Sequence, residues 1–265
     1  MKEDKFPTVS QIFSLLNDWR HLPFYSLETR AAPFFAVFMR EILKNHFGPE
    51  FHEVLIPEFP LRIGTLETER EREKRQLGKR RRPSPDQSYN VDYVAFQEDK
   101  STAYLVELKT DMDSIRPAQM DYLCRAREKK FPILVEGVKQ IAQKSNKKQK
   151  YINLLHRLSA PGIELVYIRP DSRIFDKTFD RVVAGWTSEQ KRIEVKHQNF
   201  SHIEVVYVQP KESSPNGHDF EYIYFDEVAN IVERQGDLGS LFAHCLLQWT
   251  KPAGSRNPKG LPFPP

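Results

Sequence analysis

Cysteine is almost absent from this chain of 265 residues, which contains two, Cys124 and Cys245. With two cysteines and no Cys-x-x-Cys pair, a zinc site of four thiolates is excluded and a disulfide framework is not expected. The histidines show no metal-ligand spacing, so we propose no zinc site on them either. Both cysteines lie in apolar, helix-like segments, where a free thiol packs as a small hydrophobic side chain.

Long apolar runs are missing as well. No stretch approaches the roughly 18 residues that a membrane span requires, and the charged start of the chain is not followed by the apolar core of a secretory signal. We therefore expect a soluble, cytoplasmic protein. The turns are poor in glycine and form no phosphate-binding loop, and no Gly-x-Ser-x-Gly nucleophile elbow occurs.

The residues that are present allow a sizeable core and one charged cluster. Apolar residues make up 39% of the chain and charged residues 29%, with a net charge of +4. This mild basic excess permits nucleic-acid binding but does not demand it, unless the charges are clustered. The cluster lies at 67–82, which has eight basic and four acidic residues and is followed by Pro83 and Pro85. It predicts either a mobile arm or a solvated helix that ends in a loop.

Hydrophobic periodicity predicts an α/β fold with helices and strands in a definite order. The predicted helices are 8–19, 33–47 (opening at Pro33), 114–130, 138–158, 226–232 and 238–249, and the predicted strands are 53–62, 89–96, 101–109, 163–169 and 203–209. Strands 89–96 and 101–109 flank the polar hairpin turn 97–100. We divide the chain into an N-terminal helical segment (1–30), a core (31–170) with a basic arm (67–85), a C-terminal extension of the same domain (171–250) and a proline-rich tail (251–265).

The predicted hairpin carries Asp92 in its first strand and Glu107-x-Lys109 at the end of the second. Glu107 and Lys109 share one face because strand side chains repeat every two residues. Mg²⁺ prefers oxygen ligands and is usually held by one or two carboxylates together with a substrate phosphate. Asp92 and Glu107 can supply these carboxylates if the strands pair, and the Leu108 carbonyl is a natural further ligand. Lys109 can orient an attacking water or stabilise charge on phosphorus.

At these residues the chain resembles the PD-(D/E)xK nuclease superfamily. Asn90-Val91-Asp92 followed by Val106-Glu107-Leu108-Lys109 carries the resemblance, although Val91 stands where the motif has proline. The resemblance covers roughly residues 31–170 and implies a restriction-endonuclease-like core, a central mixed β-sheet flanked by helices in the order α-β-β-β-α-β. The helix at 33–47, the strands at 53–62, 89–96 and 101–109, the helix at 114–130 and the strand at 163–169 match that order.

Further residues fit the same family pattern. Many members carry an acid in the helix before the first core strand, and Glu41 occupies that position, inside an otherwise apolar helix. Several subgroups carry a glutamine and a tyrosine in the helix after the lysine strand, and Gln119 and Tyr122 resemble that pair. Their spacing is Gln-x-x-Tyr, one residue shorter than the subgroup pattern. The resemblance implies metal ligation by Asp92, Glu107, Leu108 and Glu41, with Lys109 and Gln119 assisting catalysis.

The expected activity is Mg²⁺-dependent hydrolysis of nucleic acid, with Mn²⁺ as a substitute metal. We expect DNA ahead of RNA and an endonuclease ahead of an exonuclease, and a homodimer remains open because duplex cleavage favours two sites. Backbone phosphates are expected to meet the basic arm and the start of the following helix. The residues proposed for this contact are Lys79, Arg80, Arg81, Arg82, Ser114, Arg116 and Tyr122.

Other interpretations stay open at this point. Glu107 and Lys109 could form an ion pair on an exposed sheet, and Ser114 could simply cap its helix. The same fold could also serve as a nucleic-acid-binding module with a weak or inactive site. A third interpretation is a protein-interaction domain in which the tail from Lys251 is a docking segment.

Overall fold

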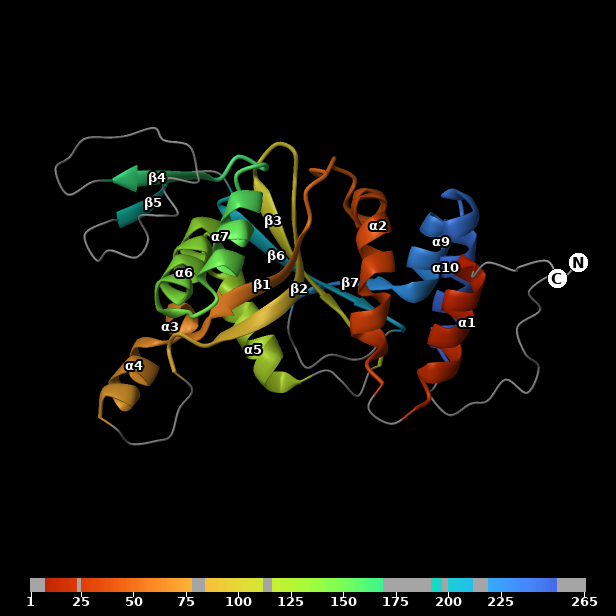
Figure 1. The fold of residues 1–265 in the computed structure, drawn as a ribbon, viewed down its shortest axis with the longest axis horizontal. Coiled ribbons are helices and arrows are strands. Elements are labelled where there is room, and N and C mark those ends of the chain that lie inside the picture. Colours follow the sequence, from red (N-terminus) through yellow and green to blue (C-terminus); the bar gives the residue numbers. More distant parts are fainter. Residues whose placement is uncertain are drawn as a thin grey trace, which may run out of the picture. The chain divides into compact units, whose positions relative to one another are not determined.

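The computed structural model describes residues 8–22, 25–77, 84–111, 116–168, 192–196, 200–211 and 219–251. It confirms a mixed α/β architecture, in which helices flank an open five-stranded sheet of strand order β1-β2-β3-β6-β7 (Figure 1). These strands are β1 (Ile56–Arg62), β2 (Ser88–Phe96), β3 (Thr102–Leu108), β6 (His202–Gln209) and β7 (Glu221–Tyr224). β1, β2 and β3 pair antiparallel, and β6 and β7 pair parallel. In this part of the chain, no helix is both long and apolar enough to cross a membrane.

The chain divides into two compact units that are interleaved along the sequence. The terminal unit is drawn from Met1–Gly48, Leu108–Ile115 and Val206–Pro265, and the central unit from Pro49–Glu107 and Arg116–Val205. Two of the four boundaries, at 107/108 and 205/206, therefore fall within β3 and β6.

The central unit contains the β1-β2-β3 meander and most of the described helices. Its helices are α3 (Ile63–Leu66), α4 (Glu69–Gln76), α5 (Pro117–Arg127), α6 (Phe131–Lys144) and α7 (Lys148–Arg157). The Phe131 ring lies 5.3 Å from both Phe59 and Phe96, and Phe96 lies 5.0 Å from Phe200. All four rings are buried, so α6 is held on the meander by aromatic packing.

The terminal unit is built around a buried aromatic cluster. Its helices are α1 (Val9–Trp19), α2 (Leu27–Phe47), α9 (Phe225–Val232) and α10 (Gly236–Trp249), of which α1, α9 and α10 lie side by side (Figure 1). Phe242 of α10 is central, because its ring lies 5.9 Å from Phe13, 5.0 Å from Phe35 and 6.1 Å from Trp249. Residues from both ends of the sequence therefore share one core.

The predicted helices at 8–19 and 238–249 and the strands at 53–62, 89–96, 101–109 and 203–209 are confirmed within a few residues. Helix α2 begins at Leu27, so the predicted start at Pro33 was wrong and Pro33 lies inside the helix. Leu27 and Ala31 are buried, and we attribute the extra turns to this apolar burial, which outweighs the hydrogen-bond donor that proline lacks.

The predicted helix at 138–158 is two helices, because Ser145 adopts an extended backbone and ends α6. The helix predicted to begin at Ser114 begins at Pro117, since proline suits the first helical turn. Cys124 and Cys245 are free, as predicted.

The strand at 163–169 was wrongly placed in the central sheet. Its counterpart β4 (Glu164–Ile168) pairs with β5 (Arg192–Lys196) in a separate two-stranded sheet. The position next to β3 belongs to β6, which is longer than β4 and buried from Val205 to Gln209.

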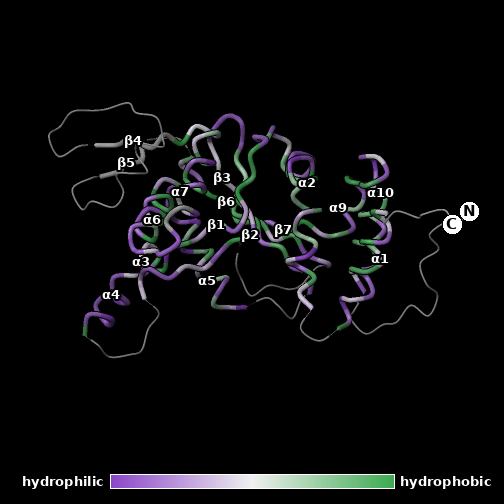
Figure 2. The backbone as a smooth tube through the Cα atoms, in the orientation of Figure 1, coloured by the Kyte–Doolittle hydropathy of each residue, from purple (hydrophilic) through white to green (hydrophobic). Residues whose placement is uncertain are grey.

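Helix α4 is the exception to the apolar packing of the central unit. It has no buried residue, and Figure 2 shows it mostly in the hydrophilic colour. Thr68 closes its N-terminus with a capping box in which the Thr68 hydroxyl accepts from Glu71 N and Glu71 accepts from Thr68 N. The solvated helix predicted for the basic arm is therefore confirmed at 69–76, whereas residues 78–83 lie outside the described part.

Candidate functional site

The hairpin aligns the two proposed carboxylates. Tyr93 pairs with Val106 and Val94 with Leu105, and the next step of this antiparallel register sets Asp92 opposite Glu107. Side chains directly opposite each other lie on the same face, with their Cβ atoms about 5 Å apart. Glu107 is buried at 2% exposure and Asp92 is half-buried. In this row of carboxylates, solvent exposure therefore increases from β3 to β2.

A third carboxylate, which the sequence interpretation missed, continues this row. β1 pairs with β2 through Pro57–Tyr93 and Phe59–Val91, which sets Glu58 opposite Asp92. Glu58 is exposed and its backbone lies in the left-handed region at φ 50°, a conformation that costs a non-glycine residue roughly 1 kcal/mol or more. The Asn90 amide donates to the Glu58 carboxylate at 3.3 Å.

Gln119 of α5 holds the buried end of the row, because its side-chain amide donates a short hydrogen bond to Glu107 Oε1. An amide donor on a buried carboxylate fixes the orientation of that carboxylate. Gln119, which the family resemblance implied as a site residue, thus contacts Glu107 in the structure.

Asp92 also acts on the neighbouring Tyr93, which is buried at 3% exposure. Burial raises the pKa of Tyr93 well above its usual value, and the negative charges of Asp92 and Glu58 raise it further. Tyr93 is therefore a neutral phenol beside two acids.

Tyr122, one turn after Gln119, contacts β2 through an aromatic pair. Its ring stacks on Tyr89 with centroids 4.1 Å apart and 30° between the planes. Burial, together with the hydrogen bond to Tyr89, raises the pKa of Tyr122 to about 12. Arg125 lies over the same tyrosine, with its Cζ 5.6 Å from the ring centroid, which is within cation–π range.

The remaining described candidates belong to the terminal unit. Lys109 is buried at 3% exposure, its Nζ lies 3.5 Å from Glu28 Oε2, and its N–H donates to Val208 O at 2.8 Å. Leu108 is fully buried at the end of β3. Glu41 is half-buried in α2, and its carbonyl accepts from the Asn45 side chain at 2.8 Å.

The predicted phosphate-contacting residues are described only in part. Lys79, Arg80, Arg81, Arg82 and Ser114 lie outside the described residues. Arg116 is exposed at the N-cap position of α5, where its side chain makes no capping hydrogen bond.

The side chains at the candidate site decide whether the expected Mg²⁺ can bind there. In the described part of the chain, no group of three or more His, Cys, Asp or Glu side chains converges to hold a metal ion. Mg²⁺ does not need such a cage, because it commonly keeps several waters and uses one or two protein carboxylates. Acids directly opposite on paired strands repel, so Asp92 and Glu107 fit a cation that offsets this repulsion.

No protein-family model, curated protein or solved structure matches the chain.

Sequence reasoning missed four residues around the candidates: Glu28, Glu58, Tyr89 and Arg125. Arg125 could have been found, because residues 119, 122 and 125 share one helical face at a spacing of three. Glu28 and Glu58 had no such signal, since their positions depend on where α2 begins and on the register of β1.

Proposed function

We propose that this protein hydrolyses phosphodiester bonds of nucleic acid with the help of Mg²⁺, at a site of the PD-(D/E)xK type. One feature of the hairpin carries the proposal: Tyr93 pairs with Val106, the same register continued by one residue sets Asp92 opposite Glu107, and the Gln119 amide donates to the Glu107 carboxylate. The expected order α-β-β-β-α-β fits α2, β1, β2, β3, α5 and β6 in sequence, with β6 in place of the strand first expected.

Each residue has a distinct role in this proposal. Asp92 and Glu107 would supply carboxylate oxygens for Mg²⁺, and the Leu108 carbonyl and Glu41 are the further ligands that the family resemblance implies. Bound Mg²⁺ would lower the pKa of a coordinated water and neutralise phosphate oxygens. Gln119 fixes Glu107 through its hydrogen bond, which prevents the buried carboxylate from rotating away.

Lys109 is included in the proposed site because it follows Glu107 by two residues in an extended segment, so both side chains project to the same face. Its ammonium group would stabilise negative charge on the phosphate or orient the attacking water. The carboxylate of Glu28, 3.5 Å from the Lys109 Nζ, limits the directions in which the Lys109 side chain can point.

The proposed substrate is DNA ahead of RNA, cleaved internally. The basic residues Lys79, Arg80, Arg81 and Arg82 would hold the backbone through salt-dependent contacts with phosphates. A homodimer would give one site to each strand of a duplex.

The test is cleavage by the purified protein. Single-stranded DNA, duplex DNA and RNA are incubated with Mg²⁺, Mn²⁺ or EDTA, and products are resolved on denaturing gels. We expect metal-dependent cleavage that Asp92→Ala and Lys109→Ala each abolish. Glu98→Gln is the matched control, because Glu98 is an exposed acid in the turn of the same hairpin. Absence of metal-dependent cleavage on all three substrates contradicts the proposal.

A second candidate is a nucleic-acid-binding module that does not cleave. The ion pair between buried Lys109 and Glu28 favours it, because such a pair is also typical of a structural lysine. Salt-sensitive binding of DNA without cleavage in the same assay would support this candidate.

A further inference from the structure

Arg125 is surrounded by acceptors in an arrangement that resembles a bound phosphate. Its Nη1 lies 2.6 Å from Glu71 Oε2, and its Nη2 lies 2.6 Å from Asp121 Oδ2. The third donor, Nε, contacts the other Asp121 oxygen at 3.3 Å. The planar guanidinium fork binds carboxylate and phosphate with the same bidentate geometry. Carboxylates here occupy the positions that phosphate oxygens would take.

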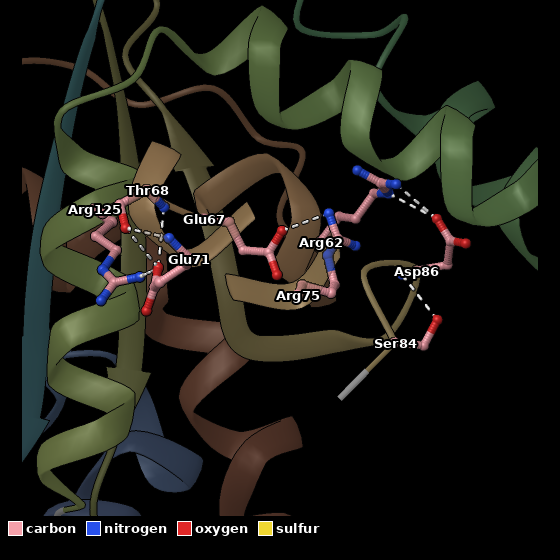
Figure 3. Close-up of polar contacts among 8 residues, drawn as sticks. All are labelled: Arg62, Glu67, Thr68, Glu71, Arg75, Ser84, Asp86 and Arg125. Carbon is pink, nitrogen blue, oxygen red and sulfur yellow. Dashed lines mark hydrogen bonds and ion pairs between the residues drawn. The ribbon is translucent and has the colours of Figure 1, made fainter. Parts of the chain in front are cut away.

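The two acids differ in how firmly they are tied to Arg125. Asp121 lies one turn earlier on the same helix, α5, so it stays near Arg125 whatever else moves. Glu71 comes from α4, and Figure 3 shows Arg125 reaching across to it beside Thr68. The Glu71–Arg125 contact therefore joins two separate elements of the central unit.

Helix α4 is joined to the rest of the central unit, among the described residues, by polar contacts. It has no buried residue, and a helix of eight residues is too short to be stable alone. Its contacts with the rest of the central unit are polar: Glu71 with Arg125, and Arg75 with Glu67 at 2.9 Å (Figure 3). Burial disfavours ionisation of Glu71, but hydrogen bonds from Thr68 and Arg125 outweigh it and lower the pKa of Glu71. Glu71 is therefore an anion near neutral pH, and salt or a stronger anion can displace it.

The separation of Arg125 from Gln119 along α5 also matches the spacing of phosphates along a nucleic-acid strand. Gln119, Tyr122 and Arg125 share one face of α5, and Gln119 contacts Glu107. Six residues of helix span about 9 Å, which corresponds to two or three phosphates along a helical strand. A strand whose reacting phosphate lies at Asp92 and Glu107 could thus bring another phosphate to Arg125.

We propose that Arg125 is a backbone-phosphate-binding residue and that Glu71 occupies its guanidinium until nucleic acid binds. A phosphate then replaces the Glu71 carboxylate, while the Tyr122–Tyr89 stack keeps the arginine in place. This inference rests on the proposed function, because it assigns a further contact for the same substrate. Binding must therefore overcome an internal competitor.

The test measures affinity for a fluorescently labelled single-stranded DNA oligonucleotide, and for the matching duplex, by anisotropy in EDTA at several salt concentrations. Glu71→Gln removes the competitor and keeps the side-chain shape. Glu73→Gln removes the same charge from an exposed position of the same helix that makes no ion pair within the described residues. The control is needed because loss of any acid raises affinity for DNA through the long-range field.

We expect Glu71→Gln to bind about twofold to fivefold tighter than Glu73→Gln at low salt, which is the range of one ion pair near the surface. Arg125→Gln should weaken binding and reduce the slope of log affinity against log salt by about 0.7 to 0.9, the value of one phosphate contact. In the Arg125→Gln background, the two glutamate substitutions should become equivalent.

Three outcomes are decisive. If the wild-type protein binds DNA but Glu71→Gln and Glu73→Gln have equal affinities, Arg125 is only a structural anchor of α4 and the inference fails. If Arg125→Gln leaves both affinity and salt slope unchanged, it fails in the same way while the proposed function stands. If no variant binds DNA and the cleavage assay is also negative, the proposed function fails as well.

Discussion

Replacing Asp92 with asparagine should stabilise the metal-free protein, which is the opposite of what most substitutions do. Asp92 is the middle acid of the row, with Glu58 and Glu107 opposite it on the two neighbouring strands. Asparagine has nearly the same shape but no charge, so it removes two like-charge contacts at once. It is therefore a probe of electrostatics rather than of packing.

The magnitude follows from the cross-strand geometry. Coulomb's law with an effective dielectric constant of about 20 gives roughly 3 kcal/mol for like charges about 6 Å apart, as an upper bound. Measured cross-strand charge pairs contribute about 0.2–1 kcal/mol. For two pairs we expect the free energy of unfolding to rise by about 0.5–2 kcal/mol. In a chain of this size, each kcal/mol shifts the melting temperature by about 2–4 °C.

The assay compares thermal and urea unfolding of wild type and Asp92→Asn in EDTA and in excess Mg²⁺. Binding of Mg²⁺ to the native state should stabilise wild type by about 1.4 kcal/mol at ten times the dissociation constant, whereas the variant should gain little. The difference in free energy of unfolding between Asp92→Asn and wild type would then become smaller or change sign when Mg²⁺ is added. Glu98→Gln should respond to Mg²⁺ like wild type. A variant that is less stable than wild type in EDTA, together with equal responses to Mg²⁺, would refute the reasoning.

Three further outcomes are expected. Gln119→Ala removes the amide donor from buried Glu107 and should lower the free energy of unfolding by about 1–3 kcal/mol, measured by urea titration, with Gln143→Ala on an exposed face as the control. For Asp86, burial disfavours the anion, but hydrogen bonds from Lys144 and Arg62 outweigh it and lower the pKa of Asp86 below its usual value. The stabilisation from Asp86 should therefore be complete above that value and be lost as pH falls through the lower folded-state pKa, so wild type and Asp86→Asn should converge in urea stability toward pH 2; a constant difference would contradict this. Phe242→Ala opens a cavity in the aromatic core of the terminal unit and should cost about 3–5 kcal/mol, with loss of hydrogen-exchange protection in α1 and α10.

The hairpin could be predicted from sequence because its information is local. Two alternating strands separated by the four residues 97–100 leave few registers, so the pairing of Asp92 with Glu107 follows from the turn. Gln119 and Tyr122 were proposed from their resemblance to the family pattern, and their spacing of three residues places them near each other on the surface of α5. Arg125 follows the same spacing, but its importance depends on Glu71, which lies 54 residues earlier in the chain.

Other parts depend on tertiary packing that no local pattern encodes. Pro33 is a standard helix-start signal, yet burial of Leu27 carries α2 six residues further toward the N-terminus. β4 has the apolar composition of a central strand, but its partner is β5 rather than β3. Glu58 was missed because its place opposite Asp92 depends on a non-local pairing of a strand that contains Pro57 and Pro60.

The interleaving of the two units sets the order in which the protein can mature during synthesis. Helices α1 and α2 are made before the central unit, whereas α9 and α10, which complete their core, are made after it. At about 5–20 residues per second, the delay is roughly 10 to 40 s. During this interval Phe13, Phe35 and Phe38 lack the aromatic partner Phe242. The aromatic core of the terminal unit can therefore close only after α10 has been made.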